Sequence, residues 1–119
     1  MDRAQLNIEL AQTMKSICYA PKLSEADLII SIVSTALHLH PDDIKSNSRD
    51  HDLADARQII SKILYERQFV YREIGEVLHR DHSTMVIALR RYQDKIDIKD
   101  KEFAGKVALV AEEMEALCV

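Results

Sequence analysis

The stretch YREIGEVLHRDHSTMVIALRRYQDKI, residues 71–96, decides the fold of this chain of 119 residues. In its first part, Ile74, Val77 and Leu78 recur at the spacing of one helix face, which predicts a helix over residues 71–78. Its second part predicts an amphipathic helix over residues 82–95, with one apolar stripe formed by Met85, Ala88, Leu89, Tyr92 and Ile96. Because only His79-Arg80-Asp81 separates the two, we expect a helix-turn-helix.

Helical spacing also runs through the rest of the chain. It predicts an opening helix over residues 4–19, a second helix from about Ser24, a third from about Leu53 and a last one over residues 102–117. Ser24 followed by Asp27 indicates a capping box at the start of the second helix, although its β-branched run leaves a strand as an alternative. The expected fold class is therefore all-α, a compact helical bundle.

The middle of the chain combines a polar segment with an amphipathic helix. PDDIKSNSRDHD, residues 41–52, has Ile44 as its one apolar anchor and predicts a single helical turn followed by an exposed loop. In the helix that follows, Arg57, Gln58 and Lys62 fall on the polar side. These three residues are candidates for contact with a ligand.

Composition excludes several large classes of enzyme. The chain has only two glycines, Gly75 and Gly105, so it cannot form a G-x-x-x-x-G-K phosphate loop or a G-x-G-x-x-G dinucleotide fingerprint. A G-x-S-x-G nucleophile elbow is excluded for the same reason. We therefore expect no catalytic residues and no cofactor.

Cysteine and histidine usage gives no support for a metal or redox site. Cys18 and Cys118 lack C-x-x-C spacing, and His79 and His82 have no evident third ligand beside them. No apolar run is long enough for a signal peptide or a membrane span, so we expect a cytoplasmic protein with free thiols and no contact with membranes. A disulfide joining the two cysteines remains the alternative.

Because the chain is net acidic, any contact with nucleic acid must depend on a local group of basic residues. Sixteen Lys and Arg against twenty Asp and Glu give a formal charge of −4 and a pI near 5.7. Residues 49–95 hold nine basic and eight acidic side chains, whereas both flanking segments are net acidic. A general attraction to polyanions is therefore not expected.

The start of the predicted second helix of the helix-turn-helix carries groups suited to base edges. The Asp81 carboxylate can accept from a cytosine amino group, and the Thr84 methyl can pack on thymine. His82 and Ser83 can bond to base edges or phosphates. The alternative is that Asp81 only caps the helix, which stabilises it by about 1 kcal/mol. Similarly, Arg90 and Arg91 could form no more than a solvated face.

The sequence contains the string RDHSTMVIALRR, with EIGEVL before it and ARQ farther upstream. This combination resembles the C-terminal DNA-binding domain of the bacterial replication initiator DnaA. The signature of that family is close to RDHTTV. The likeness runs from about Ser24 to Lys95. It implies a bundle related to the Trp repressor that reads a short AT-rich box in double-stranded DNA near the replication origin. On this basis residues 23–119 form the DNA-binding domain, and residues 1–22 form an N-terminal helical extension.

The resemblance also implies roles for individual residues. Base contacts in the major groove fall on Asp81, His82, Ser83 and Thr84. A loop arginine, Arg49, reaches into the adjacent minor groove. The residues expected at the DNA backbone are Arg57, Gln58, Lys62, Arg80, Arg90 and Arg91.

Three departures from the family pattern bear on function. The loop KSNSRDHDLAD has aspartates where the family has a dense run of Lys and Arg. The turn of the helix-turn-helix is one residue short and lacks the usual glycines. Ile87 occupies a position at which a polar contact residue is common in the family. We expect sequence-specific DNA binding without an ATPase module. The alternative is a helical protein-interaction module of the same fold, which binds a protein partner or a second copy through its first or last helix.

Overall fold

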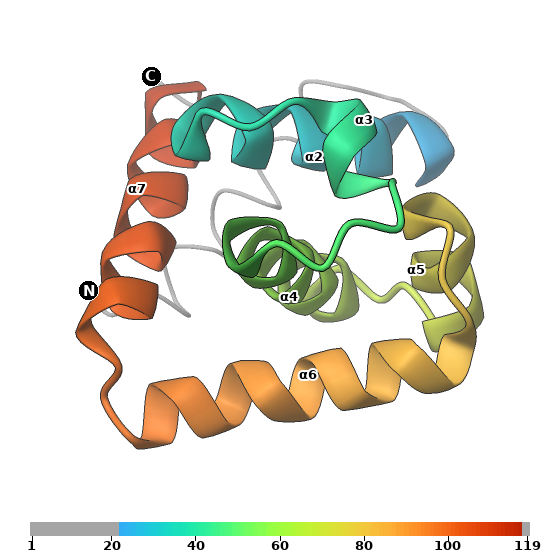
Figure 1. Ribbon diagram of the computed structural model, residues 1–119. Coiled ribbons are helices and arrows are strands. Elements are labelled where there is room, and N and C mark those ends of the chain that lie inside the picture. The colour runs from blue at the N-terminus through green and yellow to red at the C-terminus, as the bar shows by residue number, and fades with distance from the viewer. Residues whose placement is uncertain (1–21, 118–119) are drawn as a thin grey trace.

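The computed structural model describes residues 22–117, in which all regular structure is helical (Figure 1). The helices are α2 (Lys22–Leu37), α3 (Pro41–Ile44), α4 (His51–Glu66), α5 (Tyr71–Leu78), α6 (His82–Asp97) and α7 (Lys101–Leu117). The all-α prediction is confirmed, while the helix expected over residues 4–19 and both cysteines lie outside the described residues. Among the helices in this range, none has the length and apolar character needed to cross a membrane.

Helix α4 lies at the centre and is buried on almost every side. In Figure 1 it is seen nearly end-on, with α2 and α3 above it, α6 below it and α5 to its right. The α7 helix packs against α2 and α6. The expectation that Arg57 and Gln58 would occupy a polar outer side is wrong, because they are only 8% and 5% exposed. Only Lys62 of that set is partly exposed.

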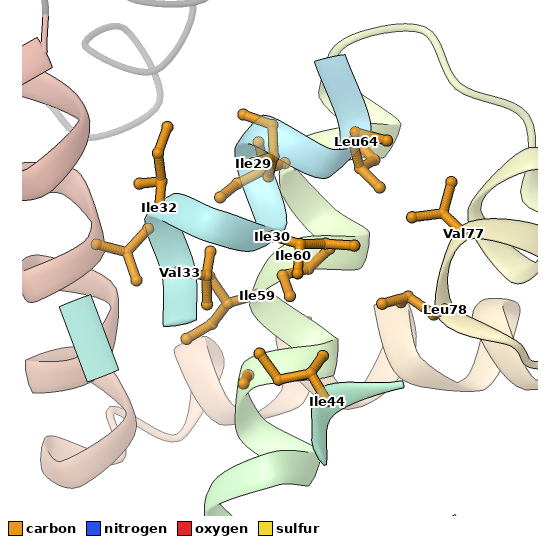
Figure 2. Packing of buried hydrophobic residues seen from close by; sticks show 14 of the residues in the cluster. Ile29, Ile30, Ile32, Val33, Ile44, Ile59, Ile60, Leu64, Val77 and Leu78 are labelled. Carbon is orange, nitrogen blue, oxygen red and sulfur yellow. The ribbon is translucent and has the colours of Figure 1, made fainter. Parts of the chain in front are cut away.

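The β-branched run in α2 forms a helix because two neighbours cover it. Ile29, Ile30 and Val33 are almost fully buried, and Figure 2 shows them beside Ile60 and Leu64 of α4. α2 also packs along α7, so a wide apolar face is needed. The strand alternative is therefore wrong, since tertiary packing on both sides outweighs the weaker helix propensity of isoleucine and valine.

Two helices begin earlier than the sequence indicated. α2 starts at Lys22, so the capping box predicted from Ser24 and Asp27 is wrong, and the Asp27 carboxylate lies 3.7 Å from Nζ of Lys45. α4 starts at His51 because Asp50 caps it, its Oδ1 accepting from the Asp52 N–H at 3.0 Å.

An ion pair joins the end of α4 to the start of α2. Arg67 follows the last residue of α4 and is 5% exposed, and its Nε and Nη2 both donate to Oε1 of Glu25. The pair is largely shielded from water, so it holds the two helices in one relative position.

The turn between α5 and α6 depends on a close approach of backbone to backbone. His79 ends α5 in the left-handed region, with φ 56° and ψ 46°, and the Arg80 N–H then donates to the Gly75 carbonyl at 2.7 Å. A Cβ on Gly75 would lie 2.5 Å from the Arg80 carbonyl oxygen. Gly75 is therefore the residue that lets this short turn close without the glycines that the family pattern places in the turn itself.

Gly75→Ala is expected to lower the free energy of unfolding by about 1–3 kcal/mol, because the added methyl group meets a backbone oxygen that can move only if the turn opens. Urea unfolding followed by circular dichroism measures the change.

Gly105→Ala is the matched control. Gly105 lies inside α7, and a Cβ added there would have no neighbouring atom within 4 Å, so alanine should raise stability by about 0.5–1 kcal/mol. Equal effects of the two substitutions would contradict the steric role of Gly75.

Candidate nucleic-acid interface

A cleft of about 740 Å³ lies between the α3–α4 loop, α4 and the helix-turn-helix. Its lining residues are Asn47, Ser48, Arg49, Ala54, Arg57, Gln58, His79, Arg80, Asp81, Thr84, Met85, Ile87, Ala88 and Arg91. Four arginines against one aspartate give the lining a positive charge in a protein whose net charge is −4. A positively charged lining attracts anions, so this cleft is suited to an anionic ligand.

The start of α6 presents its first side chains to solvent. Asp81 occupies the N-cap position, yet its side chain makes no capping hydrogen bond, and its Oδ1 lies 3.1 Å from Nδ1 of His82. His82, Ser83 and Thr84 are exposed. The geometry gives no support to the alternative that the Asp81 carboxylate serves only as a helix cap. Asp81 and Thr84 line the cleft, with His82 and Ser83 next to them in the chain.

Arg57 faces the inside of the α3–α4 loop. Its guanidinium donates to four backbone carbonyls: Nε to Ile44 at 2.7 Å, Nη1 to Ser48 at 2.7 Å, and Nη2 to Asp43 at 3.1 Å and Ser46 at 2.9 Å. Burial and the neighbouring Arg80 guanidinium lower the pKa of Arg57 below its ordinary value. The donors of Arg57 are thus used to shape the loop that carries Arg49.

Arg80 links the same loop to the helix-turn-helix. Its Nη2 donates to the Ser46 carbonyl, and its Nη1 donates to the His79 carbonyl at 3.2 Å. The Ser46 carbonyl therefore receives hydrogen bonds from both Arg57 and Arg80. Two guanidinium groups around one carbonyl concentrate positive charge on this side of the cleft, which favours an incoming anion.

Of the arginines expected at DNA, three others are exposed and form no ion pair with any residue in the described range. They are Arg49 in the loop and Arg90 and Arg91 on α6. Arg49 and Arg91 line the cleft, whereas Arg90 does not. The alternative that Arg49 pairs with Asp50 or Asp52 is not what the structure shows, because those carboxylates have other partners.

Gln58 lines the cleft, whereas Lys62 does not. Nζ of Lys62 lies 2.8 Å from Oε1 of Glu66 and 5.8 Å from the ring centre of Tyr92, and the residue does not line the cleft. Gln58 does line it, and its buried Oε1 has no hydrogen-bond partner among the described residues. Of these two residues, Gln58 alone lines the cleft.

The acidic residues of the loop and early α4 are bound on another side of α4. Nζ of Lys95 and of Lys106 each lie 2.6 Å from a carboxylate oxygen of Asp55, and Lys106 also lies 2.8 Å from Asp52. Burial alone would raise the pKa of Asp55, but hydrogen bonds from Lys106 and Lys95 outweigh it and lower this pKa below its ordinary value. Neither aspartate lines the cleft, so the acidic loop sequence does not make the cleft acidic.

Tertiary packing also groups His51, Asp55 and Glu102, whose possible ligand atoms lie within 4.8 Å of one another. Spacing alone gave no sign of this group, because Glu102 comes from α7. The two lysine ammonium groups already neutralise Asp55, so this cluster gives no reason to infer a metal ion.

Sequence reasoning missed the apolar part of the cleft lining. Ala54, Met85, Ile87 and Ala88 all contribute to it, and Ile87 is 47% exposed. The position of Ile87 on the outer side of α6 could be read from helical periodicity. Its place in a cleft required the loop to fold over α4.

Comparison with known proteins gives one consistent family. Residues 26–91 match the family described as bacterial dnaA protein helix-turn-helix. The chromosomal replication initiator protein DnaA of Tropheryma whipplei strain Twist is 33% identical over 106 residues, which cover 87% of this chain. That of Kosmotoga olearia is 26% identical over 91 residues, or 76% of this chain. This chain spans 22% and 20% of the lengths of these relatives, about a fifth.

Arg57→Ala is expected to lower the free energy of unfolding by about 2–3 kcal/mol, because four backbone carbonyls of α3 and the α3–α4 loop each lose a hydrogen bond. Arg49→Ala, at an exposed residue in the same loop, should change it by no more than about 0.5 kcal/mol. Chemical denaturation of both variants is the measurement. Equal stability of the two would contradict the role of Arg57 in holding the loop.

Asp55→Asn is expected to lower the free energy of unfolding by about 3 kcal/mol near neutral pH, since two lysines lose their buried counter-charge. The lowered pKa means that the contribution of Asp55 is complete above 3.8 and is lost as the pH falls through its folded-state pKa. The difference in free energy of unfolding between the wild type and Asp55→Asn should therefore become smaller at acid pH.

Urea titrations at about pH 7 and about pH 3 test this dependence. Asp52→Asn is the matched control, because Asp52 shares Lys106 but its side chain is 59% exposed, and we expect less than about 1 kcal/mol. If the loss of unfolding free energy caused by Asp55→Asn is the same at both pH values, the proposed dependence of stability on the ionisation of Asp55 is ruled out.

Proposed function

The chain belongs to the bacterial DnaA helix-turn-helix family, and from this premise we propose that it binds double-stranded DNA in a sequence-specific way and does not itself hydrolyse ATP. The DNA would be a short AT-rich box of the kind used at replication origins, and the setting would be the bacterial cytoplasm. One observation carries the proposal: Arg49, Arg80 and Arg91 converge on a cleft beside the exposed start of α6.

In this proposal the start of α6 enters the major groove. The N-terminal residues of the second helix contact base edges in helix-turn-helix proteins. Here Asp81, His82, Ser83 and Thr84 occupy those positions, and all four are exposed. Their polar groups supply acceptors and donors for base edges, and the Thr84 methyl group offers contact to thymine.

The arginines position the duplex. Arg90 and Arg91 are available for phosphates along α6, and Arg49 reaches the minor groove from the loop. Arg57 acts indirectly as a positioning residue that holds this loop, and Arg80 braces the loop from the turn. Gln58 lines the cleft and would donate its amide N–H to the DNA backbone. Lys62 has no role in DNA contact in this proposal, because it is paired with Glu66.

The salt dependence of binding should be shallow. The cations available to phosphates are Arg49, Arg80, Arg90 and Arg91. About four phosphate contacts predict a slope of about −3.6 for the logarithm of the binding constant against the logarithm of salt concentration.

Fluorescence anisotropy of a labelled duplex tests the proposal at about 50 mM and about 200 mM salt. A family-type AT-rich box should bind at least about tenfold more tightly than a scrambled duplex. His82→Ala should weaken binding to the box by about 1–3 kcal/mol and reduce discrimination. Arg91→Ala should weaken binding to every sequence alike, whereas Lys101→Ala, which removes an exposed cation outside the cleft, should change nothing.

The outcomes separate the candidate functions. Equal, salt-sensitive binding to both duplexes would contradict recognition of the box while leaving DNA binding in place. No binding at low salt would overturn the proposal and favour the protein-interaction module. Such a module would bind its partner through the first or last helix. A second candidate surface for the partner is formed by Tyr65, Val70 and Tyr71, where the tyrosine rings stack with centroids 5.7 Å apart.

A further inference from the structure

Ile87 is an exposed aliphatic side chain in a cleft otherwise marked by arginines. It is 47% exposed, whereas the other apolar residues that α6 contributes to the lining, Met85 and Ala88, are 1% and 9% exposed. Single exposed apolar residues are ordinary on protein surfaces. Leu109 on α7, 48% exposed, is such a case because it does not line the cleft. Ile87 differs from Leu109 because it lines the cleft.

The cleft-lining residues of α6 follow one face of the helix. Thr84, Ile87, Ala88 and Arg91 are spaced i, i+3, i+4 and i+7, and all four line the cleft. Recognition helices of the homeodomain type read bases with residues at the same spacing. Three residues advance about 4.5 Å along a helix, close to the step of about 3.4 Å between base pairs. Ile87 would therefore face a base pair next to the one that Thr84 faces.

The chemistry of the major groove leaves one suitable partner for this side chain. Base edges there display hydrogen-bond donors, acceptors and the thymine 5-methyl group, which is the only methyl group on the four bases. An isoleucine cannot satisfy a donor or an acceptor, and it would leave such a group unpaired if it covered it. Contact with a methyl group has no such cost and removes two apolar surfaces from water.

We propose that Ile87 is a specificity-determining residue that recognises a thymine through its 5-methyl group. This inference rests on the proposed function and adds a base contact beyond Asp81–Thr84. It predicts a preference for thymine at one position of the bound sequence that arises from the methyl group alone, independently of base pairing.

Deoxyuridine substitution tests this preference directly, since it removes the methyl group and keeps the Watson–Crick edge. A tight-binding duplex is first selected from random sequences with the wild-type chain at about 50 mM salt. Each thymine is then replaced singly, and Kd is measured by anisotropy. At one thymine, replacement should weaken wild-type binding about fourfold, as expected for the contact of about one buried methyl group. Ile87→Ala should abolish that penalty, and Ile87→Val should keep part of it.

Two variants serve as controls. Thr84→Ser removes the threonine methyl group and keeps the hydroxyl, so any loss of methyl preference should occur at a different thymine from the one coupled to Ile87. Leu109→Ala should leave the penalty at every thymine unchanged. Helicity by circular dichroism should be the same in all of these variants, because Ile87, Thr84 and Leu109 are exposed.

Failure of this inference is distinguishable from failure of the proposed function. If Ile87→Ala binds the duplex and keeps the full wild-type penalty at every thymine, the methyl contact is wrong while DNA binding stands. If no thymine replacement affects the wild-type chain, the inference is likewise overturned. If the wild-type chain binds no duplex at low salt, the proposed function and this inference are both overturned.

Discussion

The carbonyl groups of the α3–α4 loop converge on the guanidinium of Arg57, and one wall of the cleft exists because of this arrangement. Arg57 is buried on the central helix, so the loop is held against the part of the molecule least able to move. Arg80 donates to the Ser46 carbonyl of the same loop, which fixes the helix-turn-helix relative to that wall. Because Arg57 of α4 and Arg80 of the turn donate to carbonyls of the same loop, Arg49 and the start of α6 are presented together.

Separation of charge explains how a protein of net charge −4 has a basic cleft. The aspartates near the loop are engaged elsewhere, with Asp55 bound by Lys95 and Lys106 and Asp50 capping α4. The two lysines that bind Asp55 come from α6 and α7, so the C-terminal helix contributes to the electrostatics of the loop region without lining the cleft. The cleft is therefore lined by arginines, while Asp52 and Asp55 are paired with lysine away from it.

The tight turn between α5 and α6 closes without a glycine of its own. The turn lacks glycine, and His79 takes the left-handed conformation that glycine favours. The space that the turn needs is provided one turn earlier in the helix, where Gly75 has no side chain to meet the Arg80 carbonyl. The helix-turn-helix therefore has a short turn, and α6 begins with its first side chains exposed.

The sequence by itself determined the helices, the helix-turn-helix and its family, because apolar spacing and the run RDHSTMVIALRR are local properties. Helix starts set by capping were less well predicted, as Asp50 and Ser24 show, since several nearby residues can begin a helix. Only the tertiary structure decided that Arg57 faces carbonyls, that Asp55 is enclosed by lysines and that Ile87 lies in a cleft. Each of these depends on a contact between distant segments, and periodicity along one helix shows which side a residue occupies but not what covers that side.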